Sequence, residues 1–150
     1  MFLQNLRARM NARLSGDREA GFTLIELLVV MLILGILAAI AIPAFFNQRD
    51  KGTDAQAKAA VRTAQTAMET WATENQGEYT GATAEILEGI EPTLEDANLN
   101  EPTELGADSY EVSVESDTET DFIISRNGGT VDFDCTPVGG GCPTGGNWNE

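Results

Sequence analysis

A continuous apolar stretch dominates the first third of the chain. From Leu27 to Phe46 no side chain carries a charge. At about 1.5 Å per residue, a helix of this length covers the ~30 Å hydrocarbon core of a bilayer. Near its far end stands Pro43, which cannot donate a hydrogen bond to the Ala39 carbonyl. The pattern predicts a helix that can span a membrane, with a kink at Pro43.

Beyond this stretch the apolar pattern takes the spacing of an amphipathic helix. Apolar side chains recur at intervals of three and four residues, at Ala57, Ala60, Val61, Ala64, Ala67, Met68 and Trp71. Gly77 is suited to end this helix, and Gly52 weakens it. We expect one helix from Phe22 to about Asn75. Its first half would lie in lipid, and its second half would present an apolar stripe to another element.

Apolar and polar residues then alternate with a period of two, which is typical of strands. Three segments favour strands, at residues 110–115, 122–125 and 131–135. Between the last two, Asn127-Gly128 is a strong hairpin signal. The strands therefore predict an antiparallel meander whose apolar face packs on the helical stripe. The expected fold class is α+β, with a long N-terminal helix and a small antiparallel sheet.

Charge is distributed very unevenly along the 150 residues. The net charge is −15, and residues 63–150 hold 19 acidic side chains and a single basic one, Arg126. Such a surface repels nucleic acid, so we expect no direct nucleic-acid binding by this region. The connector at residues 77–106 shares this acidity and offers only a short helical pattern, from Ile86 to Leu94.

Basic residues flank both ends of the apolar stretch. Four arginines precede it, at Arg7, Arg9, Arg13 and Arg18, and four basic residues follow it, at Arg49, Lys51, Lys58 and Arg62. The positive-inside rule therefore leaves the orientation open. A cleaved secretory signal with its cut after residues 39–41 is an alternative, but the apolar run is longer than such signals need and the helical pattern continues beyond it.

The stretch GFTLIELLVVMLILGILAAIAIP, residues 21–43, resembles the N-terminal signature of type IV pilins and their pseudopilin relatives. The residues that follow, to about position 80, resemble the helix of bacterial major pilins. The resemblance implies that residues 1–21 are a cytoplasmic leader, cut after Gly21 by a prepilin peptidase, and that Phe22 becomes an N-methylated terminus. Residues 22–52 would then form the transmembrane and assembly helix, and residues 53–150 an extracellular head.

Glu26 is the one acid at the start of the apolar helix. Thr23-Leu24-Ile25-Glu26 fits the capping-box pattern, so the carboxylate can serve its own helix. The resemblance favours a further role in assembly, in which Glu26 of one subunit pairs with the Phe22 amine of its neighbour. An unpaired acid in a bilayer costs about 2.5 to 3.5 kcal/mol, and pairing would offset that cost. Both roles can hold together.

Two cysteines enclose a short turn-rich loop, Cys135 and Cys142. If the head is extracellular, as the resemblance implies, a disulfide is favoured over two free thiols or half of a metal site, and the chain has no histidine to complete a zinc site. Asp132 and Asp134 beside the loop are more typical of a solvent-facing strand than of a calcium site. The glycines at residues 139–146 are expected to form a flexible surface loop.

The expected function is structural, because no catalytic constellation and no need for a cofactor is recognisable. By resemblance, the chain would be a single-pass membrane prepilin that polymerises through its apolar helix into an extracellular type IV pilus. Its partners would be further copies of itself, the prepilin peptidase, the assembly platform and ATPase, and the membrane. A minor pilin or a pseudopilin of a secretion or DNA-uptake machine is the alternative within the family. An acidic binding domain, secreted or membrane-anchored, is the alternative of another class.

Overall fold

The computed structural model describes residues 22–149, which divide into two compact units between Ile42 and Pro43. The first unit holds the N-terminal part of helix α2, Leu24–Glu74. The second holds the rest of α2 and all that follows it. The predicted leader and its cleavage residue Gly21 lie outside the described residues.

Helix α2 ends where the backbone turns into the left-handed region. Gln76 and Gly77 have φ angles of 62° and 88°, and the Gly77 N–H donates to the Ala72 carbonyl at 2.8 Å. Glycine adopts this conformation without steric cost, so it reverses the chain directly after the helix. The prediction of one helix running to about Asn75 is confirmed. Pro43 lies inside this helix, and the kink expected there stays a prediction.

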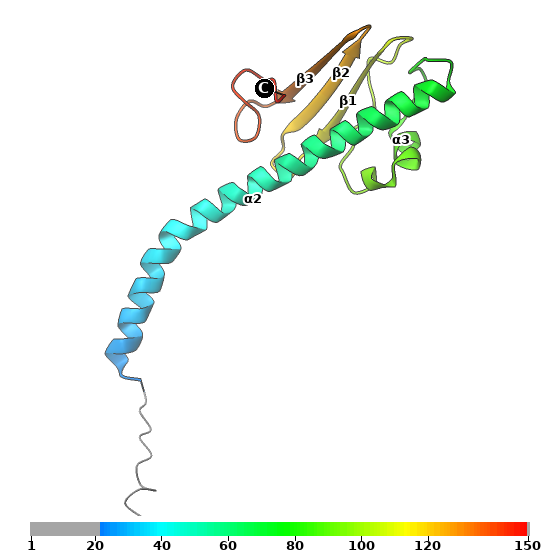
Figure 1. Ribbon diagram of the computed structural model, residues 1–150. Helices are drawn as coiled ribbons and strands as arrows, with labels where there is room; N and C mark the ends of the chain where they lie inside the picture. Colours follow the sequence, from blue (N-terminus) through cyan, green and yellow to red (C-terminus); the bar gives the residue numbers. More distant parts are fainter. Residues whose placement is uncertain (1–21, 150) are drawn as a thin grey trace, which may run out of the picture. The chain divides into compact units, whose positions relative to one another are not determined.

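Three antiparallel strands form the sheet in the order β1-β2-β3, as Figure 1 shows. They are β1 (Ser109–Glu115), β2 (Asp121–Asn127) and β3 (Thr130–Thr136). The predicted meander is confirmed. The second turn falls one residue later than predicted, because Asn127 pairs with Thr130 and leaves Gly128-Gly129 as the loop. Gly128 has φ +60°, which a residue without a β-carbon adopts readily.

The core lies between α2 and one face of the sheet (Figure 1). The helix contributes Ala57, Val61, Ala64, Ala67, Met68 and Ala72, and the sheet contributes Tyr110, Val112, Val114, Phe122, Ile124 and Cys135. Small alanines on the helix allow close packing, and each large apolar side chain stabilises the fold by roughly 1.5 to 3 kcal/mol. The predicted contact between the helical stripe and the apolar sheet face is confirmed.

The acidic connector closes one side of this core. Helix α3 (Ala84–Ile90) begins at Thr83, whose side chain accepts a hydrogen bond from the Ile86 N–H, and a short 3-10 helix, η1 (Pro92–Leu94), follows it. Leu87 and Leu94 are fully buried. The short helical pattern predicted from Ile86 to Leu94 therefore corresponds to two short helices that place these leucines in the core.

Both edges of the sheet are paired with irregular chain. Beside β1, the Thr103 N–H donates to the Glu111 carbonyl at 2.9 Å, and the Glu111 N–H donates back at 2.8 Å. Beside β3, the Cys135 N–H donates to the Gly146 carbonyl at 2.7 Å. An open edge would offer unpaired backbone groups to other strands. These two segments therefore limit edge-to-edge association of the sheet.

Candidate functional site

The N-terminal half of α2 is apolar on every side and has no cover within the described residues. Its large side chains from Leu24 to Phe46 are all exposed, with Ile40 at 71% and Leu32 at 64%. By length and composition, α2 is the one helix among residues 22–149 that could cross a membrane. A helix that is apolar all round is stable only when lipid or other protein surrounds it. This segment therefore needs a partner or a membrane.

Glu26 closes a capping box with Thr23 at the start of α2. The Thr23 N–H and hydroxyl donate to Glu26 Oε2 at 2.8 and 2.7 Å, and the Glu26 N–H donates to the Thr23 hydroxyl at 3.3 Å. Reciprocal bonds of this kind satisfy backbone donors that the first helical turn leaves free. The local role foreseen for Glu26 is thus present. Phe22 directly precedes the cap and is 81% exposed.

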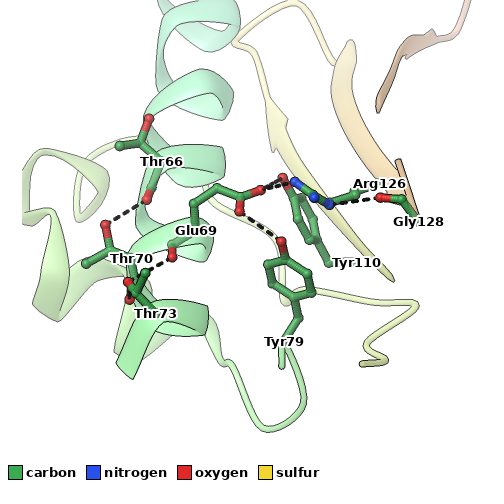
Figure 2. Close-up of polar contacts among 8 residues, drawn as sticks. All are labelled: Thr66, Glu69, Thr70, Thr73, Tyr79, Tyr110, Arg126 and Gly128. Atoms are coloured by element: carbon green, nitrogen blue, oxygen red, sulfur yellow. Dashed lines mark hydrogen bonds and ion pairs between the residues drawn. The ribbon is translucent and has the colours of Figure 1, made fainter. Parts of the chain in front are cut away.

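In the second unit, Glu69 is the centre of a polar cluster between α2 and the sheet (Figure 2). One carboxylate oxygen accepts from the Tyr110 hydroxyl at 3.0 Å and from Arg126 Nη1 at 2.9 Å. The other accepts from the Tyr79 hydroxyl at 2.8 Å. Residues from α2, the following loop and two strands therefore meet on one side chain. The only basic residue of the acidic region, Arg126, is used here.

Both tyrosines of this cluster are held in their neutral form. Burial raises the pKa of the Tyr110 hydroxyl well above its usual value, and the negative charge of Glu69 adds to the effect. The pKa of Tyr79 is raised for the same two reasons. Their rings also contact each other, with centroids 4.6 Å apart. A neutral phenol can donate to Glu69, and the raised pKa values keep both phenols neutral to higher pH.

Asp54 is buried near the start of the second unit although it carries a carboxylate. Its side chain is 3% exposed, and Oδ1 accepts hydrogen bonds from the Ser116 and Thr118 hydroxyls of the β1–β2 turn. A β-carbon on Gly141 would collide with this carboxylate, so Gly141 passes directly against it. Asp54 therefore joins α2 to the turn and to the cysteine loop.

A disulfide joins Cys135 and Cys142, with an S–S distance of 2.01 Å and a Cα–Cα distance of 5.6 Å. The bond matches the expectation from the sequence. Asp132 and Asp134, beside the loop, lie exposed on the outer face of the sheet. Val138, in the loop, is 58% exposed. Among the described residues after Phe46, it is the one large apolar side chain that is exposed.

The C-terminal segment that follows the glycine-rich residues 139–146 is anchored to the rest of the second unit. The flexible surface loop expected at residues 139–146 stays a prediction. Trp148 is 7% exposed, and its indole N–H donates to the Ile123 carbonyl at 3.2 Å. Arg62 donates to the Asn149 side chain at 2.6 Å, and its guanidinium lies 4.9 Å from the Trp148 ring. Glycine permits the sharp backbone path, but these side chains fix the segment.

Sequence reasoning missed several of these residues. Asp54 and Glu69 counted only as two of many acids, and Trp148 lay in a segment rich in turn formers. The one usable signal was the position of Trp148 after β3, since a tryptophan seldom stays exposed. Nothing in the spacing along the chain indicated which strand residues Glu69 would meet.

The N-terminal region matches a family model, the prokaryotic N-terminal methylation motif, over residues 16–42. Over a longer stretch, the chain is 32% identical to the type IV wide pilus major component PilA4 of Thermus thermophilus, covering 78% of this chain and 81% of that protein. The chain belongs to the type IV pilin family. The α+β fold of this pilin, with its long apolar helix and small sheet, agrees with that membership. It is a structural protein and not an enzyme.

Other relatives match a smaller share of the chain. The pilin is 44% identical to the type IV major pilin protein PilA of Myxococcus xanthus over 38% of its own length and 26% of that protein. It is 33% identical to the type II secretion system core protein G of Pectobacterium carotovorum, over 41% of its own length and 39% of that protein. The match thus spans about a quarter to two fifths of these relatives. No solved structure matches the chain.

Proposed function

We propose that this pilin is a structural subunit of a type IV pilus, polymerised through the N-terminal half of α2. The observation that carries the proposal is the apolar, exposed surface from Leu24 to Phe46 on a chain of this family. In the subunit before assembly, lipid would cover this surface. In a filament, the same segments of neighbouring copies would cover it.

Processing would precede assembly. Residues 1–21 would form a cytoplasmic leader, cut after Gly21 by a prepilin peptidase, and Phe22 would become the methylated N-terminus. Residues 22–52 would act as the membrane and assembly helix, and residues 53–150 as the extracellular head. The family match over residues 16–42 brackets the cut, which supports this division. The assembly platform and its ATPase would supply the work of extraction from the membrane.

Glu26 would then exchange partners during assembly. In the single chain its carboxylate accepts from Thr23. Removal of the leader would create a positively charged amine on Phe22, four residues before this carboxylate in sequence. We infer that Glu26 of one subunit pairs with the Phe22 amine of the next one and so fixes the axial offset between them.

Mass spectrometry of the surface fraction sheared from cells tests the proposal. An abundant mature chain that begins with methylated Phe22 is the expected result. A chain that begins at Ile42 would instead establish a conventional cleaved signal. Release of the head as a soluble monomer, with no filament, would favour an acidic binding domain and overturn the proposal.

A pseudopilin of a secretion machine is the second candidate. The observation that favours it is the similarity to three type II secretion system core proteins G, each over about two fifths of this chain. Such a subunit would form only a short filament. The same mass spectrum separates the two functions, because a pseudopilin would be scarce in the sheared fraction and abundant in the membrane.

A further inference from the structure

A groove of about 230 Å³ lies beside α2, between the helix, the segment after η1 and the end of β1. Its lining includes the apolar side chains of Ala57, Ala60, Ala97 and Val114 among polar ones. Three carboxylates, from Asp96, Glu115 and Asp117, belong to its lining, and no basic residue does. A groove that combines apolar side chains with three carboxylates suits a side chain that has an aliphatic stem and a cationic head, such as lysine.

Lys51 is a cation available for such a contact. It is exposed, and it makes no hydrogen bond or ion pair within residues 22–149. The other basic residues on its side of the helix are engaged, since Lys58 Nζ donates to the Gly141 carbonyl at 2.9 Å and Arg62 bonds Asn149. Lys51, Lys58 and Arg62 share this side because they are seven and four residues apart.

The helix geometry prevents Lys51 from reaching the groove of its own chain. Ala60, which lines the groove, is nine residues further along α2, which is about two and a half turns at 3.6 residues per turn. The two side chains therefore project from opposite sides of the helix. Arg49, unlike Lys51, projects from the side of the helix that carries the groove, because it lies four residues before the lining residue Thr53.

We propose that the groove of one copy receives Lys51 of a neighbouring copy. The inference rests on the proposed function and adds a contact between heads to the contact between apolar helices. Groove and lysine lie on opposite sides of the helix, so the contact is heterologous, and a heterologous contact that does not close into a ring propagates as a filament. It also joins opposite charges in a region whose acidity would otherwise drive copies apart.

Charge-reversal variants test the contact between Lys51 and the groove. Lys51→Glu and Asp117→Lys should each lower the ratio of sheared filament to membrane-held mature subunit by roughly tenfold, because they place like charges across the interface. The double variant, Lys51→Glu with Asp117→Lys, should restore most of the filament. Asp132→Lys is the matched control for Asp117→Lys, since it makes a similar change on the outer face of the sheet, and it should assemble normally.

A second measurement does not depend on charge. Filaments from cells that carry Lys51→Cys together with Asp117→Cys should give ladders of covalently joined chains with a short thiol-specific cross-linker. Normal filament yield from both single charge variants, or filaments that yield monomers only after cross-linking, would overturn the contact while leaving the pilus function standing. A wild-type chain that forms no filament at all would overturn both.

Discussion

Arg126 on β2 reaches Glu69 on α2, with Nη1 and Oε1 2.9 Å apart, and this is the one salt bridge within residues 22–149. The two side chains are 32% and 41% exposed, so water screens their attraction in part. Two tyrosines share the same carboxylate. The pair therefore acts as one part of a hydrogen-bonded connection between helix and sheet.

Arg126→Met should lower the free energy of unfolding by about 1 kcal/mol, since a partly exposed ion pair contributes no more than this and the phenols still serve Glu69. Urea unfolding of the mature chain, followed by tryptophan fluorescence, measures the change. A double-mutant cycle with Glu69→Gln isolates the interaction between the two side chains. The coupling free energy from this cycle should decrease in high salt. If Arg126→Met lowered the free energy of unfolding equally in the wild-type chain and in the Glu69→Gln variant, a direct interaction would be contradicted.

The two tyrosines should titrate above their ordinary pKa of about 10. Because the folded state holds the phenols neutral, their contribution to the free energy of unfolding should be constant below pH ~10 and fall as pH rises beyond it. The chain has 2 tyrosines, so phenolate absorbance reports this cluster alone. Tyr110→Phe should leave only the Tyr79 titration. Ordinary titration of Tyr110 in the folded chain would argue against its burial beside Glu69.

Replacing both Cys135 and Cys142 by alanine should lower the free energy of unfolding by ~2 kcal/mol, because the closed loop is shorter than the 15-residue loop worth about 3 kcal/mol. The lost anchor should also loosen the segment that pairs with β3. Thiol labelling of the unfolded, unreduced wild-type chain checks the premise. Two labelled cysteines per chain would show that no disulfide forms.

Trp148→Ala should lower the free energy of unfolding by about 3 to 5 kcal/mol, more than loss of the disulfide does. The substitution removes a buried aromatic ring and its hydrogen bond to the Ile123 carbonyl. The variant should also expose the edge of β3 and increase association of heads. Urea unfolding gives the first effect, and light scattering gives the second. Trp148→Phe keeps the apolar volume in part and serves as control, with a smaller loss expected.

Glu26→Gln separates the two roles of the N-terminal carboxylate. Glutamine still fits the capping box, so the helix should remain intact, but it carries no charge to pair with the Phe22 amine. Filaments should therefore disappear while mature subunit accumulates in the membrane. Glu26→Ala should behave in the same way.

Thr23→Ala is the matched control for the cap. It removes the hydroxyl of the capping box, at a cost of about 1 kcal/mol, and retains the carboxylate. Filaments should persist in this variant. Electron microscopy with immunoblots of the mature subunit compares all three changes. If Thr23→Ala and Glu26→Gln reduced filaments equally, capping alone would explain Glu26.

The elements of this pilin could be inferred from local patterns. Spacings of three and four along Ala57 to Trp71 predicted the buried helix face, and alternation at Tyr110 to Val114 predicted a strand face. The Thr23-Glu26 cap and the helix end near Gly77 were also recognisable. These features depend on residues that are close in sequence, since helix and strand periods bring them to one surface before any long-range contact forms.

The partners of the polar residues depended on the packed structure. Glu69 meets Arg126 across 57 positions, Lys58 meets Gly141 across 83, and Arg62 meets Asn149 across 87. A local pattern shows which face a side chain occupies but not which distant segment will cover it. Asp54 could not be distinguished from the solvated acids around it, and the groove near Asp117 exists only where three segments converge. These contacts and the burial of Asp54 follow from how the sheet, the connector and the C-terminal segment pack on α2, because burial depends on all the elements that pack together.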